Sequence, residues 1–358
     1  MKINTAKLKR ALDELKLIAS RKAGLEILYC VHLKAENGYL EITASNLDEY
    51  QLEWVECVGE LTACCVGRER LGWAIGGEET IIELVDENLT VSFGRNEVVL
   101  KTLEADQFPA WPAGDMEAIG VSCPDMARGI ESVAFAACTN GSREELATIH
   151  IVGKPKSIAC EACNSHELAI WKADLISAMF DVVIPSSIVP NFCSALTKDG
   201  STFSISENLV QVAHDFGKYA AKQLSTRYPN TEALINSITD QIEFGTLKIS
   251  ELADVVDRCA FYGDPQKSMA VDVHFSKDGA EFKCVGNNSD MVFYIDGKFP
   301  DWETRYNADS LKMCLRAVKS DTATLAGSNI TTIIKYGDVS IYTNGLRKEK
   351  KETKKAAK

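Results

Sequence analysis

The sequence predicts a β-rich α+β fold in which one β-α-β-β-β unit of about 60 residues occurs six times. Segments with apolar residues at helical spacing recur at regular intervals, and strand-like segments separate them. Each helical segment has one apolar face, so it must lie on one side of a sheet. Phe108-Pro109 and Tyr228-Pro229 hold equivalent places after the second and fourth units, which indicates that the units pair into three domains.

The domain boundaries are expected near residues 115 and 238. The predicted domains cover 1–115, 116–238 and 239–346, and a basic tail covers 347–358. The tail holds seven Lys or Arg residues and two Glu, a net charge of +5 (7 − 2), and its largest apolar residue is Ala. Such a segment cannot bury itself and is expected to be disordered.

The first unit shows the pattern most clearly. Leu8, Leu12 and Leu15 recur at helical spacing, and Asn37-Gly38 is a strong hairpin signal. The predicted helix follows a short strand at 2–4, and further strands are expected at 25–33, 39–44 and 50–55.

The other units repeat this order. In the second, a strand at 61–66, a short helix at 68–75 and a strand at 80–85 precede a hairpin within 89–112, whose turn is predicted at Arg95-Asn96. Helices of the remaining units are expected at 124–135, 187–197, 248–260 and 308–319. Their strands are expected at 120–122, 147–152, 156–162, 168–171, 182–184, 202–206, 209–214, 219–224, 269–275, 280–285, 291–296, 322–326, 330–335 and 338–342.

Composition limits the class of protein. The chain has 358 residues, 46% of them hydrophobic and 25% charged, as in globular proteins. No run of 18 apolar residues exists, and charges interrupt the N-terminal apolar pattern, so neither a membrane span nor a signal peptide is predicted. We therefore expect a cytoplasmic protein without a membrane partner. The net charge of −12 disfavours a protein whose surface is coated in nucleic acid, although a local basic surface can coexist with an acidic exterior.

The twelve cysteines include one CxxC pair, Cys160 and Cys163. A zinc site needs a second pair or histidines at matching spacing, and none follows. A redox motif would open a helix, whereas this pair lies in a strand-like segment. Buried structural thiols are therefore favoured over a metal or redox site.

Catalytic and nucleotide-binding motifs are missing. The sequence contains no phosphate-binding loop, no GxSxG and no paired metal-ligand histidines. The acidic pairs Asp13-Glu14, Glu78-Glu79 and Glu144-Glu145 suit solvated surfaces better than a nuclease site. We expect no enzymatic activity, no metal and no cofactor.

Every predicted helix carries a basic residue on it or beside it. Lys312, Arg316 and Lys319 share one helical face. Exposed helices carry such residues in any case, but their recurrence in an acidic chain indicates a phosphate-binding surface without base preference. The candidate residues are Lys9, Arg10, Lys16, Arg21, Lys22, Arg68, Arg70, Arg128, Arg143, Lys198, Lys248, Arg258, Lys312, Arg316 and Lys319.

These features resemble the bacterial β sliding clamp family, the processivity subunit of the replicative DNA polymerase. Residues 38–48, GYLEITASNLD, resemble a family hairpin and its turn. Residues 92–109 resemble the family's Ser-Gly-Arg strand and its link to Phe-Pro. Residues 162–169 resemble its Ala-Thr-Asp-Gly-His-Arg-Leu-Ala segment, and Val183-Ile-Pro185 resembles the start of its fourth unit. The resemblance covers about residues 1–346 and agrees with the repeat.

The resemblance implies three tandem DNA-clamp domains per chain, each of two β-α-β-β-β units, with helices lining the inside of a ring and sheets outside. A homodimer would encircle duplex DNA and tether DNA polymerase and other replication or repair proteins. A separate ATP-driven clamp loader would open it. The alternative is a clamp-like peptide-binding scaffold that does not encircle DNA.

Partner peptides of the family enter a pocket, and the resemblance implies which residues would form it here. His166 is equally an ordinary strand-end histidine. The implied pocket residues are Leu146, Cys163, Ser165, His166, Leu168, Ile235, Tyr342, Gly345, Leu346 and Arg347.

The implied dimer interface places Phe261 and Tyr262 of one subunit against Phe108 and Trp111 of the other. The first two aromatics are equally compatible with a core position. The basic tail is either a solvated end or a second DNA contact.

Three departures from the family pattern affect these expectations. Thr343-Asn-Gly-Leu-Arg347 replaces a Met-Pro-Met-Arg-Leu ending, Ser165-His166-Glu167 replaces Gly-His-Arg, and Glu144-Glu145 replaces aromatic residues that touch DNA. A divergent clamp of phage or mobile-element origin is a hypothesis consistent with them.

Overall fold

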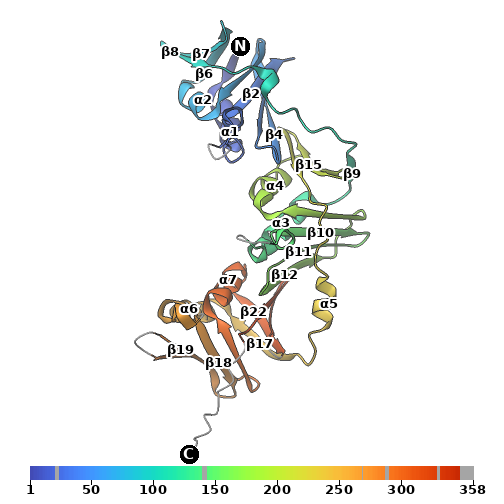
Figure 1. Cartoon of the computed structure of the whole chain (residues 1–358), viewed down its shortest axis with the longest axis vertical. Helices are drawn as coiled ribbons and strands as arrows, with labels where there is room; N and C mark the ends of the chain where they lie inside the picture. The colour runs from blue at the N-terminus through green and yellow to red at the C-terminus, as the bar shows by residue number, and fades with distance from the viewer. Residues whose placement is uncertain (21–23, 139–142, 268, 287–289, 329–330, 347–358) are drawn as a thin grey trace, which may run out of the picture. The chain divides into compact units, whose positions relative to one another are not determined.

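The computed structural model describes residues 1–20, 24–138, 143–267, 269–286, 290–328 and 331–346 (Figure 1). It is a mixed α+β structure in which helices pack against antiparallel sheets, as the repeat predicts. The contacts divide the chain into two compact units. Unit 1 contains Met1–Ala127, Ile176–Ala178 and Ser187–Ser225, and unit 2 contains Arg128–Leu175, Met179–Ser186 and the chain from Thr226.

The first two repeats of the chain lie in unit 1. Asn4 caps the first helix by accepting a hydrogen bond from the Lys7 amide at 3.0 Å, and Leu8 and Leu12 are buried beneath it. The elements are β1 (Lys2–Asn4), α1 (Thr5–Glu14), β2 (Cys30–Glu36), β3 (Tyr39–Ser45), β4 (Glu49–Val58), β5 (Leu61–Gly67), α2 (Arg68–Ala74), β6 (Glu79–Val85), β7 (Asn88–Phe93) and β8 (Asn96–Lys101).

Two predicted boundaries in this region are wrong. The strand expected at 25–33 begins only at Cys30, because Glu26–Tyr29 form a 3-10 turn. The turn expected at Arg95-Asn96 lies one residue earlier, because Gly94 takes the left-handed conformation, at φ +59, and Asn96 already belongs to β8. The Asn37-Gly38 turn joins β2 to β3 as predicted, with both residues at positive φ.

The third and fourth repeats contribute to both compact units. The strand expected at 120–122 lies earlier, at Glu117–Ile119. Their elements are β9 (Glu117–Ile119), α3 (Cys123–Val133), β10 (Thr148–Lys154), β11 (Ser157–Cys163), β12 (Glu167–Ala173), β13 (Phe180–Pro185), α4 (Val189–Leu196), β14 (Thr202–Ile205), β15 (Leu209–His214) and β16 (Gly217–Lys222).

The last two repeats lie in unit 2, after a helix that the sequence prediction missed. α6 and α7 pack side by side against strands of this unit (Figure 1). The elements are α5 (Thr231–Asn236), β17 (Ile242–Lys248), α6 (Ile249–Tyr262), β18 (Ala270–Ser276), β19 (Gly279–Val285), β20 (Asp290–Ile295), β21 (Trp302–Asn307), α7 (Ala308–Ala317), β22 (Thr322–Ser328), β23 (Thr331–Tyr336) and β24 (Val339–Asn344).

Antiparallel pairing joins the repeats at two equivalent junctions. Within unit 1, β4 pairs with β16, and the register places Glu53 opposite Gly217. Within unit 2, β12 pairs with β24, and Trp171 lies opposite Val339. Strands that are distant in the sequence thereby form continuous sheets, and both pockets described below lie at these junctions.

The cysteines are free, as the sequence analysis favoured. Cys160 and Cys163 are buried in β11, and within the described residues only Cys138 is half-buried instead of buried. Burial raises the pKa of the Cys64 thiol to about 11 and that of Cys65 to about 12, so both are protonated at neutral pH.

Candidate functional site

A pocket of about 610 Å³ lies in unit 2, beside the junction of β12 and β24. The turn before β12 forms one side of it. Asn164 closes this turn, since its side-chain oxygen accepts the amides of His166 at 2.7 Å and Glu167 at 2.8 Å. The turn therefore holds Ser165 and His166 at the rim of the pocket.

The structure brings together six of the ten residues that the resemblance implied for this pocket. Leu168 is 2% exposed at its base, and Tyr342 on the neighbouring strand is half-buried. The six are Leu146, Cys163, Ser165, His166, Leu168 and Tyr342.

Three of the other four residues, Ile235, Gly345 and Leu346, do not line it. Leu234 of α5 and Ile238, which follows the helix, line the pocket in place of Ile235. Gly345 and Leu346 follow the end of β24. The Leu346 amide donates to the Arg305 carbonyl oxygen at 2.6 Å. Arg347 lies outside the described residues, as does the basic tail at 347–358.

The wall that the sequence analysis missed is α5. Asn230 caps it by accepting the Ala233 amide at 2.9 Å. A cap residue followed by Thr-Glu-Ala-Leu-Ile was the signal that could have revealed this helix. Leu234 of α5 is 48% exposed over the pocket, which leaves an apolar side chain available to a ligand.

A network of polar side chains fixes α5 to the sheet. Thr231 donates to the Glu161 carboxylate at 2.6 Å. Glu161 lies 3.7 Å from His150 Nδ1, and Asp181 lies 2.9 Å from His150 Nε2. Tyr228 stacks on the His150 ring and so holds the segment that leads into α5.

This network shifts two pKa values. Burial of His150 opposes its protonation, but the hydrogen bond with Asp181 and the nearby carboxylate of Glu161 together outweigh burial and raise its pKa. Burial likewise opposes ionisation of Glu161, but the nearby His150 and the hydrogen bond from Thr231 together outweigh it and lower its pKa. The charged pair is therefore favoured beneath the pocket wall.

Where the family has Gly-His-Arg, this chain has Ser165-His166-Glu167. The substituted Glu167 side chain lies in the protein interior and not at the rim of the pocket. Side chains alternate along β12, so Glu167 and its cross-strand neighbour Thr343 lie on the face opposite Leu168 and Tyr342. Glu167 is 3% exposed, and its Oε1 has no hydrogen-bond partner among the described residues.

Acidic neighbours hold several of the candidate phosphate-binding cations. Asp257 bridges Lys312 at 2.8 Å and Arg316 at 3.6 Å, and the Lys312 hydrogen bond lowers the pKa of Asp257. The other pairs are Lys198 with Glu14, Lys248 with Glu251, Arg258 with Asp254 and Lys319 with Glu131.

The remaining cations differ in their surroundings. Arg68 donates to the Leu12 carbonyl oxygen at 3.3 Å, and Arg10 lies over the Phe216 ring at 5.4 Å. Arg128 is exposed and engaged with a neighbouring group. Arg21 and Lys22 lie outside the described residues. Among the candidates in the described part, Lys9, Lys16, Arg70 and Arg143 are exposed and take part in none of these ion pairs or ring contacts.

The four candidate interface aromatics differ in exposure. Phe261 and Tyr262 are 81% and 42% exposed, so they are surface residues and not core. Phe108 is buried within its own chain against Cys30 and Cys65. Trp111 lies between Tyr50, at 6.0 Å, and Lys218, at 4.3 Å from the ring centre.

The repeat and its strand junctions define a protein of the sliding-clamp fold. No family model matches the chain. Curated proteins named β sliding clamp do match it. That of Rickettsia felis is 24% identical over 335 residues, covering 86% of this chain and 87% of that protein, and that of Streptococcus pneumoniae is 27% identical over 260 residues, covering 68% and 67%.

Solved structures agree with these relatives. The DNA polymerase III subunit beta of Pseudomonas aeruginosa matches with a TM-score of 0.88 at 16% identity, covering 97% of this chain and 99% of that one. A sliding clamp of the same organism bound to griselimycin matches equally well, at 17% identity with the same coverage. The resemblance to the bacterial β sliding clamps and the predicted fold are therefore confirmed.

Proposed function

We propose that this chain is a DNA sliding clamp, a polymerase processivity factor that encircles duplex DNA as a homodimeric ring. It tethers DNA polymerase and other replication and repair proteins through the pocket beside β12 and β24. The observation that carries the proposal is the pocket, built by the turn at Asn164, Tyr342 and α5, in a chain similar to β sliding clamps over nearly its whole length.

The assembly follows the predicted domains, 1–115, 116–238 and 239–346, with helices toward the DNA and sheets outside. Lys9, Lys16, Arg70 and Arg143 contact phosphates, and Phe261 and Tyr262 meet the other subunit. The clamp performs no reaction, needs no cofactor and depends on a separate ATP-driven loader. It acts in the cytoplasm. None of the helices in the described part of the chain has the length and apolar character that crossing a bilayer requires.

A topological test separates encirclement from ordinary binding. The protein is loaded onto nicked circular DNA with its loader, and the circle is then cut once. A ring slides off the new ends, so bound protein falls to background, whereas an uncut circle retains it. Retention on the linear DNA contradicts encirclement. Light scattering should give twice the chain mass of 39.3 kDa, and a monomer at micromolar concentration excludes the closed dimer.

A peptide-binding scaffold that does not encircle DNA is the second candidate. The observation that favours it is the pairing of Lys198, Lys312 and Arg316 with acids, which weakens the positive potential of the helices. In that case the pocket binds partner peptides, but the protein shows no loader-dependent retention on circular DNA.

A further inference from the structure

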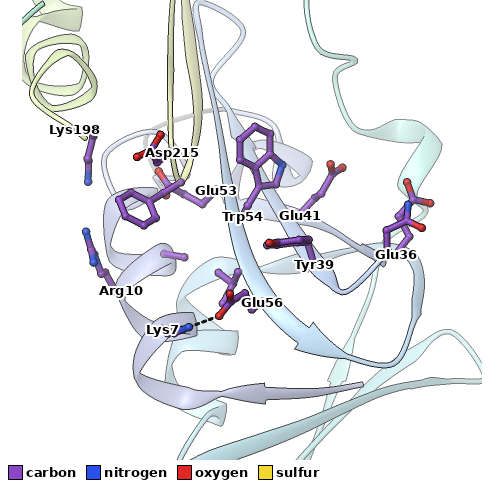
Figure 2. A pocket seen from close by; sticks show the side chains of 14 residues that line it. Lys7, Arg10, Glu36, Tyr39, Glu41, Glu53, Trp54, Glu56, Lys198 and Asp215 are labelled. Carbon is purple, nitrogen blue, oxygen red and sulfur yellow. Dashed lines mark hydrogen bonds and ion pairs between the residues drawn. The ribbon is translucent and has the colours of Figure 1, made fainter. Parts of the chain in front are cut away.

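The junction of β4 and β16 in unit 1 holds a second cavity, of about 650 Å³, which the proposed clamp activity does not use (Figure 2). Trp54, Tyr39 and Glu41 lie on one side of it, and Arg10 and Lys198 lie on the other, with Glu53 between them. All its lining residues belong to unit 1.

The two junctions of the chain are copies of each other, which allows a residue-by-residue comparison. Asn46 accepts the amides of Asp48 and Glu49 just as Asn164 accepts those of His166 and Glu167. The Trp54 amide donates to the Phe216 carbonyl at 2.8 Å, and the Lys172 amide donates to the Asp338 carbonyl at 3.0 Å. Glu53 therefore occupies the position that Trp171 occupies in the second junction.

The two positions are filled very differently. Trp171 is 2% exposed and packs so closely on Gly129 that a Cβ there would lie 2.3 Å from its ring. In the first junction Ala11 takes the place of Gly129, and the space next to it and Glu53 is part of the open cavity. The fold thus accommodates a planar aromatic group at this position in unit 2, whereas in unit 1 a carboxylate takes its place at the edge of the cavity.

A carboxylate at this position is costly for the free protein. Glu53 is 5% exposed, and Gln51 donates a hydrogen bond to it at 2.7 Å. Burial raises its pKa to about 7 despite that bond and the positive charges of Lys198 and Arg10, with Glu14 adding to the rise. At this position an apolar ring would be the more stable choice for the fold, yet unit 1 has a buried carboxylate. Such local departures from the most stable choice are typical of binding sites.

The remaining charges of the cavity favour a cation. Its lining holds five acids and three cations. Lys7 pairs with Glu56, Lys198 with Glu14 and Glu36 with Lys34, which leaves Glu41, Glu53 and Asp215 outside the ion pairs of the described residues, against Arg10. Tyr39 and Trp54 are 48% and 37% exposed, so their rings are accessible for stacking, whereas Arg10 already lies over the Phe216 ring.

We propose that this cavity is a second recognition site, which binds the guanidinium group of an arginine in a basic partner segment. The guanidinium is planar, carries five donors and stacks on aromatic rings, so it suits both the exposed rings of Tyr39 and Trp54 and the carboxylate of Glu53. Lysine has the charge but not the planar shape. The site is separate from the peptide pocket in unit 2.

The test uses the full chain and a fluorescein-labelled peptide of arginines spaced by glycines, with a lysine peptide of the same spacing as comparison. Fluorescence anisotropy is measured at about 0.15 M salt, where exposed charges are largely screened. We expect saturable binding of the arginine peptide and at least about threefold weaker binding of the lysine peptide. No saturation, or equal affinity for both peptides, overturns the proposal.

Matched variants locate the binding. Glu53→Gln keeps the size of the side chain and its ability to form hydrogen bonds. It should weaken peptide binding about tenfold or more, because a charged acceptor is lost. Glu83→Gln removes an exposed acid of β6 and should change the affinity for the arginine peptide less than about twofold. Equal losses in the two variants would reveal non-specific attraction to an acidic protein.

Exposed tryptophans provide a test that does not depend on the stability of a buried variant. Trp54→Ala should weaken binding about threefold or more, whereas Trp73→Ala, at an 85% exposed position, should leave it unchanged. Tyr342→Ala in the other pocket should also leave it unchanged. A loss with Tyr342→Ala and none with Trp54→Ala would place the peptide in the unit 2 pocket and contradict the proposal.

Discussion

The Tyr228 ring stacks on the His150 ring with their centroids 4.7 Å apart and an interplanar angle of 28°. This contact connects the sheet to the segment that builds the pocket wall, because Thr231 follows Tyr228 and donates to Glu161 beside His150. The shape of the pocket therefore depends on a half-buried pair, His150 and Glu161, that lies outside it.

The first prediction concerns pH. The folded pKa of His150 is raised, so its protonation stabilises the fold in full below its unfolded pKa, near about 6.5. This stabilisation is lost as pH rises through the folded pKa. His150→Gln should therefore reduce the free energy of unfolding more at about pH 6 than at about pH 9.

Chemical denaturation of both proteins at each pH measures this effect. The lowered pKa of Glu161 contributes stability above its unfolded pKa, and that contribution is constant over this range. His214, whose pKa burial lowers to about 4, is present in both proteins and cancels in the difference. A stability difference independent of pH would show that His150 is neutral in the folded state.

The second prediction concerns the ligand pocket of unit 2. Griselimycin, which a Pseudomonas aeruginosa clamp binds, serves as the probe. Tyr342→Ala should weaken its binding about tenfold or more, because it removes a half-buried ring from the pocket. Calorimetry measures the affinity, and Tyr294→Ala, at a 66% exposed position of β20, is the matched control. Equal affinities of the Tyr342→Ala variant and the unchanged protein would place the probe elsewhere.

The third prediction concerns the paired cations. Asp257→Asn should free Lys312 and Arg316, strengthen binding to a short duplex and steepen its dependence on salt by about 1–2 in the logarithmic slope. Asp278→Asn makes the same charge change in the exposed turn between β18 and β19 and should have little effect. Anisotropy titrations at several salt concentrations compare the two. An unchanged slope for Asp257→Asn would remove these cations from the DNA surface.

The fourth prediction concerns packing at the second junction. Gly129→Ala places a Cβ against Trp171 and should destabilise the protein by about 1–3 kcal/mol. Gly120→Ala meets no atom within 4 Å and should lower stability little. Thermal unfolding of the two variants measures the difference, and equal melting temperatures would mean that the helix shifts to accept the methyl group.

The fifth prediction concerns the thiols. In the native protein at most Cys138 should react quickly with a thiol reagent such as Ellman's, because the other cysteines are buried and inaccessible. In denaturant all twelve should react. Rapid reaction of several thiols in the native protein would show that the strands around Cys64 and Cys65 open readily.

Sequence patterns were sufficient for the repeating units, because apolar periodicity is local. Leu8, Leu12 and Leu15 had to share a helix face, and Asn37-Gly38 had to turn between strands. The order and spacing of the motifs also indicated the clamp family. The helix at Thr231–Asn236 was missed because it is short, and tertiary hydrogen bonds help to hold it.

The tertiary structure alone decided which charges remain available and which spaces remain open. The sequence supplied Lys312 and Asp257 but could not show that they pair, because they come from different helices. It supplied Glu53 and Trp171 without any sign that they hold equivalent positions, since that equivalence follows from strand register. Local patterns fixed the elements, while ion pairs and cavities depend on contacts between distant segments, which only the folded chain creates.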